Sequence, residues 1–375
     1  MKKSIRILLI LALFNNQSCN MKNDIKLLNQ SDFQKNIDGK KTDLFVLKNK
    51  NGLVCEITNY GARVVSLWVP DINNNFDDIV LGFDNIENYI SANEKYFGAT
   101  IGRYGNRIKD GKFIINDNEY YLEKNNGPNH LHGGNKGFND VIWQAEQINE
   151  QILEFKYFSK NMEEGYPGNL DIKVIYNLND YNELKIEYFA KTDESTYVNL
   201  THHSFFNLLG AGNNTVNDHF LYINANSFTP VDETLIPTGE IKLVSNTPFD
   251  FTAPTKIGKR INHDNDQLKF GNGYDHNFVL NNSNSKEILA ARVIEKKSGR
   301  ILEVYTNEPG MQLYGGNFLD GKTIGKQSKA YNYRSAFCLE TQHFPNSPNQ
   351  KNFPNTMLKP NEEYYSICIY KFSTN

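Results

Sequence analysis

The stretch DIKVIYNLNDYNELKIEYFA, residues 171–190, decides the fold class of this chain. Two strand-like segments, Asp171–Leu178 and Glu183–Ala190, lie on either side of a polar turn, which is the pattern of a β-hairpin. In LKIEY, residues 184–188, apolar and charged side chains alternate, so one face of the strand is apolar and the other is charged. The stretch therefore predicts antiparallel strands that cover a core with one face.

Two further hairpins are expected on the same grounds. Leu44–Leu47 precedes Leu53–Thr58 across a turn, and Lys112–Ile115 precedes Glu119–Leu122 across Asn-Asp-Asn. Only one stretch, about residues 86–96, has the pattern of an amphipathic helix. We therefore predict an all-β protein, built as an antiparallel sandwich.

The length of 375 residues permits two average domains, but large all-β folds also form single domains of more than 250 residues. The sequence shows no internal repeat and no linker after Ser31, so residues 31–375 are expected to form one domain. The net charge is −3 and charges of both signs are mixed throughout. Without a basic stripe to neutralise phosphates, nucleic acid is not expected as a partner.

Residues 1–19, MKKSIRILLILALFNNQSC, combine a basic head, an apolar run at residues 7–14 and a small residue before Cys19. The apolar run is too short to span a bilayer and is typical of a secretory signal peptide. Cys19 is placed as in a bacterial lipoprotein, where a lipidated cysteine would tether the chain to a membrane, and residues 20–30 read as a polar tether. This segment predicts an exported protein, either periplasmic or anchored as a lipoprotein.

The other cysteines, Cys55, Cys338 and Cys368, lie in strand-like runs and are odd in number, unlike a disulfide framework. We expect them to be small buried hydrophobic side chains. His130 and His132 are two residues apart, but no third ligand accompanies them at a familiar spacing. The sequence therefore does not predict a metal site.

The segment FCLETQHFPNSPN, residues 337–349, delivers one carboxylate, Glu340, from an apolar run to a turn rich in Pro and Asn. A strand that brings a single acid to a polar loop suits a general base better than a structural ion pair. Taken alone, the same segment is also compatible with an ordinary exposed loop.

Five other polar clusters, each flanked by aromatic or branched residues and by Gly or Asn turns, precede this segment in the chain. They are GRYGNRI (102–108), PNHLHGG (128–134), NLTHHSFFNL (199–208), GYDHNF (273–278) and PGMQLYGGNF (309–318). Together with NYGARVVSLWVPD (59–71) and YFGATIGR (96–103), they make the chain similar to the aldose 1-epimerase (galactose mutarotase) family. The resemblance covers nearly the whole chain from about Ser31 onward.

The resemblance implies a large twisted β-supersandwich and an enzyme that interconverts the α and β anomers of free hexoses such as galactose and glucose. This reaction needs one base and one acid and no cofactor. By position in the motifs, Glu340 matches the family's base and His203 its acid. A carboxylate and an imidazole suit these roles near neutral pH, because one is ionised and the other can hold a proton.

The same comparison implies the residues that bind the sugar. They are Asn106, Arg107, His132, Asp275 and Gln312. Arg103 is expected to have a structural role, as a guanidinium fork that pairs with a carboxylate or with backbone carbonyl groups. His130 is equally compatible with a turn residue. His276 is expected to lie behind the residues that contact the sugar. His202 would point to the opposite face of its strand from His203, so only one of them can enter a given pocket.

Other readings of these motifs remain open at this point. Asp275 and Glu340 could be the two carboxylates of a glycoside hydrolase, which would leave His203 without a role. A carbohydrate-binding protein of the same fold would need neither an acid nor a base. An epimerase of hexose 6-phosphates would need a cluster of cations, whereas the motifs supply little beyond Arg107. Neither the preferred sugar nor the oligomeric state can be read from the motifs.

Overall fold

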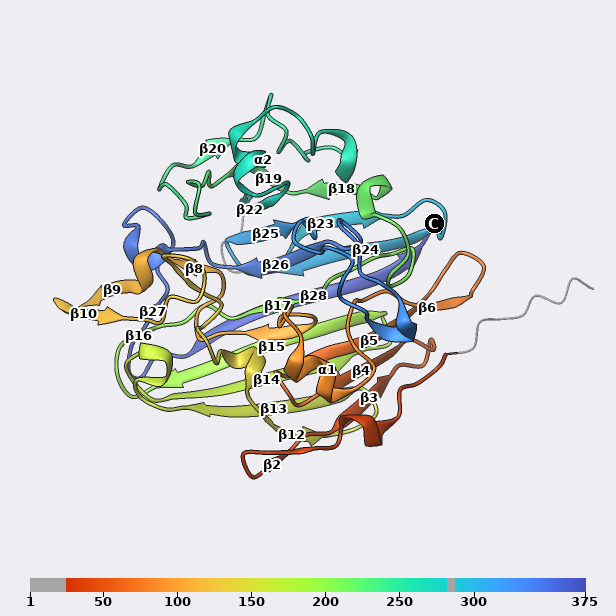
Figure 1. Ribbon diagram of the computed structural model, residues 1–375, viewed down its shortest axis with the longest axis horizontal. Helices are drawn as coiled ribbons and strands as arrows, with labels where there is room; N and C mark the ends of the chain where they lie inside the picture. Colours follow the sequence, from red (N-terminus) through yellow and green to blue (C-terminus); the bar gives the residue numbers. More distant parts are fainter. Residues whose placement is uncertain (1–24, 282–286) are drawn as a thin grey trace, which may run out of the picture.

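The computed structural model describes residues 25–281 and 287–375, and most of their regular structure is β (Figure 1). Three large sheets contain nine, five and four strands, and their neighbouring strands pair antiparallel. The predicted fold class, an all-β antiparallel sandwich, is confirmed. Residues 1–19 and Cys19, on which the signal peptide and lipid anchor were predicted, lie outside the described residues.

The nine-stranded sheet forms the long twisted layer of the molecule (Figure 1). Its strands, in spatial order, are β12 (Gln144–Gln147), β13 (Ile152–Ser159), β14 (Leu170–Leu178), β15 (Glu183–Thr192), β28 (Tyr364–Thr374), β24 (Arg300–Thr306), β23 (Ile288–Ile294), β18 (Phe220–Ile223) and β21 (Thr255–Lys256). The hairpin predicted at residues 171–190 is β14 and β15, with Leu178 opposite Leu184. Strand β28 lies between β15 and β24, so it joins two groups of strands that otherwise do not pair.

The other sheets pack against this layer. The five-stranded sheet has the order β20 (Lys242–Leu243), β19 (Ala225–Phe228), β22 (Asp275–Leu280), β25 (Gly310–Tyr314) and β26 (Cys338–Gln342). The four-stranded sheet has the order β3 (Leu44–Lys48), β4 (Val54–Thr58), β5 (Arg63–Pro70) and β6 (Phe76–Asp78). The two-stranded pairs are β1 (Asn36–Ile37) with β2 (Lys40–Lys41), β7 (Ala99–Ile101) with β17 (Thr201–His203), β8 (Arg107–Ile108) with β11 (His130–Leu131), β9 (Lys112–Ile115) with β10 (Asn118–Tyr121), and β16 (Thr196–Tyr197) with β27 (Met357–Leu358).

One continuous core joins these sheets. It includes Ile57 from β4, Phe155 from β13, Ile186 from β15 and Leu339 from β26, all fully buried. The alternation in residues 184–188 is observed as predicted, since Leu184, Ile186 and Tyr188 are buried while the two charged side chains between them are partly exposed. Burial of such apolar faces contributes about 25 cal/mol per Å² and holds the layers together.

The three described cysteines are free and buried, as expected of small hydrophobic side chains. They belong to three different strands, β4, β26 and β28.

The helical segments differ from the prediction. Helix α1 covers Ile86–Ser91 and begins at Asn85, whose side chain accepts a hydrogen bond from the Asn88 backbone N–H. It was expected to reach residue 96, but Ala92 has an extended conformation, with ψ 147°, and ends the helix early. A second helix, α2 (Asp266–Phe270), was not predicted because five residues are too few to show helical periodicity.

Short 3₁₀ turns account for the remaining helical residues. They are η1 (Gln30–Phe33), η2 (Lys109–Gly111), η3 (Phe138–Asp140), η4 (Glu163–Gly165), η5 (Val216–Asp218), η6 (Ile257–Lys259), η7 (Lys326–Ser328) and η8 (Ser347–Asn349). Across residues 25–281 and 287–375, no helix has the length and apolar character needed to cross a membrane.

The loop that follows β11 carries His132 and depends on a glycine. Gly133 has φ 87°, a conformation that other residues rarely adopt, and a Cβ at this position would lie 1.9 Å from the Gly102 carbonyl oxygen. The close approach of the two backbones fixes the loop against the segment that leads to β8.

We predict that Gly133→Ala lowers the free energy of unfolding by about 1–3 kcal/mol or more, because it combines an unfavourable φ with a steric clash. Urea denaturation of wild type and variant measures the change. Gly39→Ala is the matched control, since Gly39 has φ 76° but a Cβ added there would have no atom within 4 Å. Equal losses in the two variants would show that the approach to Gly102 is not important.

Candidate active site

One face of the five-stranded sheet forms the floor of the site. In β22, β25 and β26, Asn277 is paired with Gln312 and Gln312 with Glu340, so the three side chains form a row across the sheet. Asp275, two residues before Asn277, belongs to the same face because side chains alternate along a strand. The register therefore gathers carboxylate and amide groups from segments that are far apart in the sequence.

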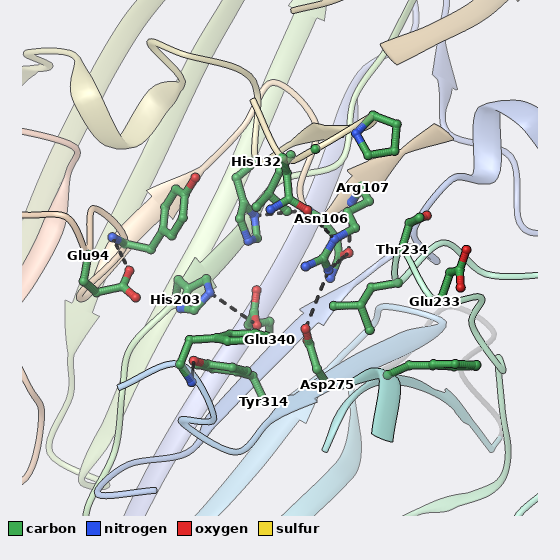
Figure 2. A pocket seen from close by; sticks show the side chains of 18 of the residues that line it. Glu94, Asn106, Arg107, His132, His203, Glu233, Thr234, Asp275, Tyr314 and Glu340 are labelled. Atoms are coloured by element: carbon green, nitrogen blue, oxygen red, sulfur yellow. Dashed lines mark hydrogen bonds and ion pairs between the residues drawn. The ribbon is translucent and has the colours of Figure 1, made fainter. Parts of the chain in front are cut away.

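Two short strand pairs supply the opposite wall. His203 ends β17, which pairs with β7, and Arg107 begins β8, which pairs with β11. Asn106 and His132 come just before β8 and just after β11, and the His132 N–H donates to the Asn106 carbonyl at 3.0 Å. Figure 2 shows these side chains around Glu340 and Asp275.

The groups surround an open cavity of about 550 Å³, a volume suited to a small-molecule ligand. The lining residues are Glu94, Tyr96, Asn106, Arg107, Asn126, Gly127, Pro128, Leu131, His132, His203, Phe205, Glu233, Thr234, Leu235, Phe270, Asp275, Tyr314, Phe318 and Glu340. Six of the seven residues predicted for the site line it. Gln312 does not.

Glu340 and His203 meet in this cavity. Glu340 Oε1 lies 3.6 Å from His203 Nε2, which is longer than a hydrogen bond and leaves both atoms able to contact a ligand. Glu340 Oε2 has no hydrogen-bond partner among the described residues. The rings of Tyr96 and Phe205 stack on the His203 imidazole, with centroids 5.7 and 4.9 Å away, and hold its orientation.

Burial favours the neutral forms of both Glu340 and His203. It raises the pKa of Glu340 well above the ordinary value, and the nearby Asp275 raises it further while Arg107 opposes the shift. Burial lowers the pKa of His203 to about 3. The pair can share one proton in two ways. Burial favours a Glu340 carboxylic acid beside a neutral His203 over a Glu340 carboxylate beside a His203 imidazolium.

Arg107 and Asp275 form the second charged pair. Arg107 Nη1 lies 3.7 Å from Asp275 Oδ2, and Arg107 Nε donates to Asn126 Oδ1 at 3.0 Å. Burial raises the pKa of Asp275, whereas Arg107 and Gln312 lower it. Gln312, expected to contact the sugar, is not among the lining residues, and its Nε2 donates to Asp275 Oδ1 at 2.7 Å.

The hydrogen bonding of His132 determines its tautomer. The Asn106 backbone N–H donates to His132 Nδ1 at 3.2 Å, so a neutral ring carries its proton on Nε2. Burial holds the pKa of His132 well below its ordinary value, so the ring is neutral. His132 is thus a hydrogen-bond donor through Nε2.

His132, His203 and Glu340 offer three ligand atoms within 4.8 Å of one another, a cluster that could suggest a metal site. Histidines that bind metals usually donate their other ring N–H to an acceptor. His132 does the reverse, since its Nδ1 accepts from Asn106. Metal binding through Nε2 would place a proton on Nδ1 facing another N–H, so the donor set does not fit a metal.

The other basic residues of the motifs lie outside the cavity. His202 faces the opposite side from His203, where Nε2 contacts Ser204 Oγ at 2.7 Å. His130 is held between the Glu123 carbonyl and the Tyr166 hydroxyl group. His276 packs against the Phe249 ring. Arg103 donates to the carbonyl groups of Pro167 and Gly168 and to Ser159 Oγ, so it is the structural fork that was expected.

Sequence reasoning missed several wall residues. Glu94 and Tyr96 fall in the segment expected to be helical, and their place in the cavity depends on the early end of α1. Tyr314 and Phe205 are in the quoted motifs, but ring-bearing residues in strands are usually core. Asn126 precedes its motif by two residues, and nothing in the sequence indicated its bond to Arg107.

A family model described as aldose 1-epimerase matches residues 43–371. The chain is 47% identical to galactose mutarotase from Bos taurus over 318 residues, which cover 85% of this chain and 90% of the relative. It is 36% identical to aldose 1-epimerase from Escherichia coli, over 89% of this chain and 96% of the relative.

Solved structures agree with the sequence comparison. An aldose epimerase homologue from C. elegans superimposes with a TM-score of 0.82 at 32% identity, over 89% of this chain and 99% of that chain. Galactose 1-epimerase from Lactobacillus acidophilus gives a TM-score of 0.79 at 28% identity, over 91% of this chain and 97% of that chain.

The predicted location is corrected by these relatives. The mammalian galactose mutarotases, which match at 47% identity for the bovine protein and 45% for the human one, are cytosolic enzymes. The prediction of an exported periplasmic protein or lipoprotein is therefore wrong. That prediction was based only on the composition of residues 1–19, and a short basic and apolar segment is weak evidence for export.

The family model spans most of the chain, the relatives match nearly their whole length, and the solved structures share the fold. The resemblance inferred from the motifs is confirmed at each of these levels. The chain belongs to the aldose 1-epimerase family.

Proposed function

We propose that the protein interconverts the α and β anomers of free hexoses such as galactose and glucose, with Glu340 as the base and His203 as the acid. Membership in the family makes it an isomerase that acts on sugar anomers. The observation that carries the assignment of roles is the buried Glu340–His203 pair, 3.6 Å apart in one cavity. Two groups so close can both reach the oxygen atoms bonded to one anomeric carbon.

The reaction requires only proton transfers and one bond cleavage. Ionised Glu340 takes the proton from the hydroxyl group on C1 while protonated His203 gives its proton to the ring oxygen. The bond between C1 and the ring oxygen then breaks, leaving an open-chain aldehyde. After rotation about the C1–C2 bond, the two residues exchange roles and the ring closes with the other configuration.

Burial makes the ionised pair costly to form, and it favours the ring-opening step once that pair has formed. The step converts a carboxylate and an imidazolium into a carboxylic acid and a neutral imidazole, which are the forms favoured by the raised pKa of Glu340 and the lowered pKa of His203. The free energy that opposes the charged pair in a buried site therefore decreases as the ring opens. Arg107 limits the shift by stabilising the Glu340 carboxylate.

The remaining groups bind the sugar. Arg107, Asp275, Asn106 and His132 present donors and acceptors around the cavity, and Gln312 holds Asp275 in place. We also infer that residues 31–375 act as one unit, because these groups come from segments between residues 94 and 340 and meet in one cavity.

The other readings are not favoured. A glycoside hydrolase that uses Asp275 and Glu340 has no role for His203, whose Nε2 lies 3.6 Å from Glu340 Oε1. A protein that only binds carbohydrate gains nothing from a buried acid–base pair, which is costly to hold in a core. A hexose 6-phosphate would find Arg107 as the sole cationic side chain among the described residues that line the cavity.

We predict that Glu340→Gln and His203→Asn each lower kcat by about 10²–10⁴-fold, the usual contribution of a general acid or base. The double variant should lose little more than either single one, because acid and base act in one coupled step. NMR measurement of α/β exchange of galactose and glucose, corrected for a protein-free sample in the same buffer, gives the rates. Wild type that binds hexose without exceeding that background would disprove the enzymatic assignment.

His202→Asn is the matched control for the choice of histidine. Because His202 faces the opposite side of β17 from the cavity, kcat per folded molecule should fall much less than in His203→Asn, although stability decreases as the contact with Ser204 changes. A comparable loss of kcat in both variants would contradict the assignment of the acid to His203.

We predict that Arg107→Ala raises KM for galactose by about tenfold or more, because a hydrogen-bonded charged group in the cavity is lost. It should also move the acid limb of kcat/KM to higher pH. Arg107 lowers the pKa of Glu340, so its removal raises that pKa and the carboxylate forms only at higher pH. Arg107→Lys keeps the positive charge but loses the planar guanidinium group with its several N–H donors. It should raise KM while leaving the acid limb nearer that of wild type, and an unshifted limb in Arg107→Ala would contradict this role.

We predict that treatment with EDTA or 1,10-phenanthroline, followed by removal of the chelator, leaves kcat unchanged. The reason is the tautomer of His132, whose Nδ1 accepts from Asn106 and whose Nε2 keeps its proton. Metal analysis of the purified protein provides the parallel measurement. Loss of activity that returns on adding one divalent metal would show that the three-residue cluster binds it.

A further inference from the structure

Glu94 is a carboxylate in the catalytic cavity that the proposed reaction does not use. It lies in the loop after α1, where its Oε1 accepts the Tyr96 backbone N–H at 3.0 Å. Glu94 forms no ion pair with any residue in the described part of the chain, and its side chain is partly exposed. Removal from water raises the pKa of Glu94 to about 7, while the Tyr96 backbone N–H and the nearby Arg63, which does not line the cavity, oppose the shift.

Glu94 stands beside the reacting groups. Tyr96, which it contacts, stacks on His203 and lies 4.6 Å from the His132 ring. Figure 2 shows Glu94 on one side of the Glu340–His203 pair, whereas Arg107 and Glu233 lie on the other side. Glu94 also lines a neighbouring hollow, with Asn93 and Phe318, so it stands between that hollow and the cavity.

The charges of the cavity are unbalanced. Its described lining contains four carboxyl groups, from Glu94, Glu233, Asp275 and Glu340, and one permanent cation, Arg107. Arg107 is already paired with Asp275 and bonded to Asn126. A ligand with a negative group would therefore meet no free cation in this lining, whereas a positive group would meet an unpaired carboxylate.

We propose that Glu94 sets the charge preference of the cavity, so that aldoses carrying an ammonium group are accepted in preference to aldoses carrying a carboxylate. The proposal rests on the proposed function and adds to it the class of substrate. An ammonium group on an amino sugar donates hydrogen bonds to the free Glu94 oxygen and gains a charge interaction in a partly buried site. A uronic acid in the same cavity is repelled by Glu94 and by the other acids.

Glu94→Gln tests this role because Gln keeps the shape and an oxygen that can accept the Tyr96 N–H but removes the charge. The measured quantity is the ratio of kcat/KM for 2-amino-2-deoxygalactose to kcat/KM for galacturonic acid, slightly above neutral pH, with galactose as the neutral reference. We expect Glu94→Gln to lower this ratio by about tenfold or more relative to wild type. Glu94→Asp, which keeps the charge, should retain most of the preference.

Glu233→Gln is the matched control, since it removes the same charge from an exposed residue on the other side of the cavity. Its ratio should stay within about twofold of wild type. An unchanged ratio in Glu94→Gln, or an equal fall in both variants, would overturn the proposal.

Galactose, the neutral reference sugar, separates a failure of the Glu94 proposal from a failure of the proposed function. If galactose exchange is catalysed but the ratio does not respond to Glu94, only the charge proposal fails. If galactose exchange is not catalysed at all, the proposed function fails, and calorimetric affinities of the same sugars for wild type and Glu94→Gln then decide the charge preference. Affinities for the amino sugar and the uronic acid that do not depend on Glu94 would overturn it.

Discussion

The antiparallel register of β25 against β26 is the constraint on which the site depends. It sets Gln312 beside Glu340 and, through β22, brings Asp275 to the same face. A shift of one residue would turn Glu340 toward the hydrophobic core and Leu339 toward the cavity. Because Leu313 and Leu339 are fully buried on the other face, the core itself opposes such a shift. The packing that stabilises the fold therefore also positions the Glu340 carboxyl group.

The electrostatics of the site follow from that burial. A carboxyl group and an imidazole held away from water both favour their neutral forms, and Arg107 is the cation that counteracts this for the carboxylates. The fold thus places Glu340 and His203 where ionisation is costly, and Arg107 moderates that cost for Glu340. The rings of Tyr96 and Phe205 stack on the His203 imidazole and fix the direction of its nitrogen atoms.

Strand pairing was predictable from the sequence because hairpins are local. The alternation at residues 184–188 and the polar turns at residues 48–52 and 179–182 identify strands that pair with their neighbours in the chain. The order of the sheets was not predictable in this way, since β28 pairs with strands far away in sequence. The site residues were predicted from motifs, which identify residues but do not show which side chains line the cavity. This is why Gln312 was expected among the lining residues although its amide group bonds to Asp275, and why Glu94 was not singled out in a segment that looked helical.

The place of β28 between β15 and β24 has a consequence for how the chain matures on the ribosome. Every other strand of the nine-stranded sheet precedes residue 307, so all are synthesised before Tyr364–Thr374 emerges. Until then, β15 and β24 each present an open edge, and such edges invite pairing with other chains. The pairing of β28, a strand made late, with both β15 and β24 closes the two edges at once.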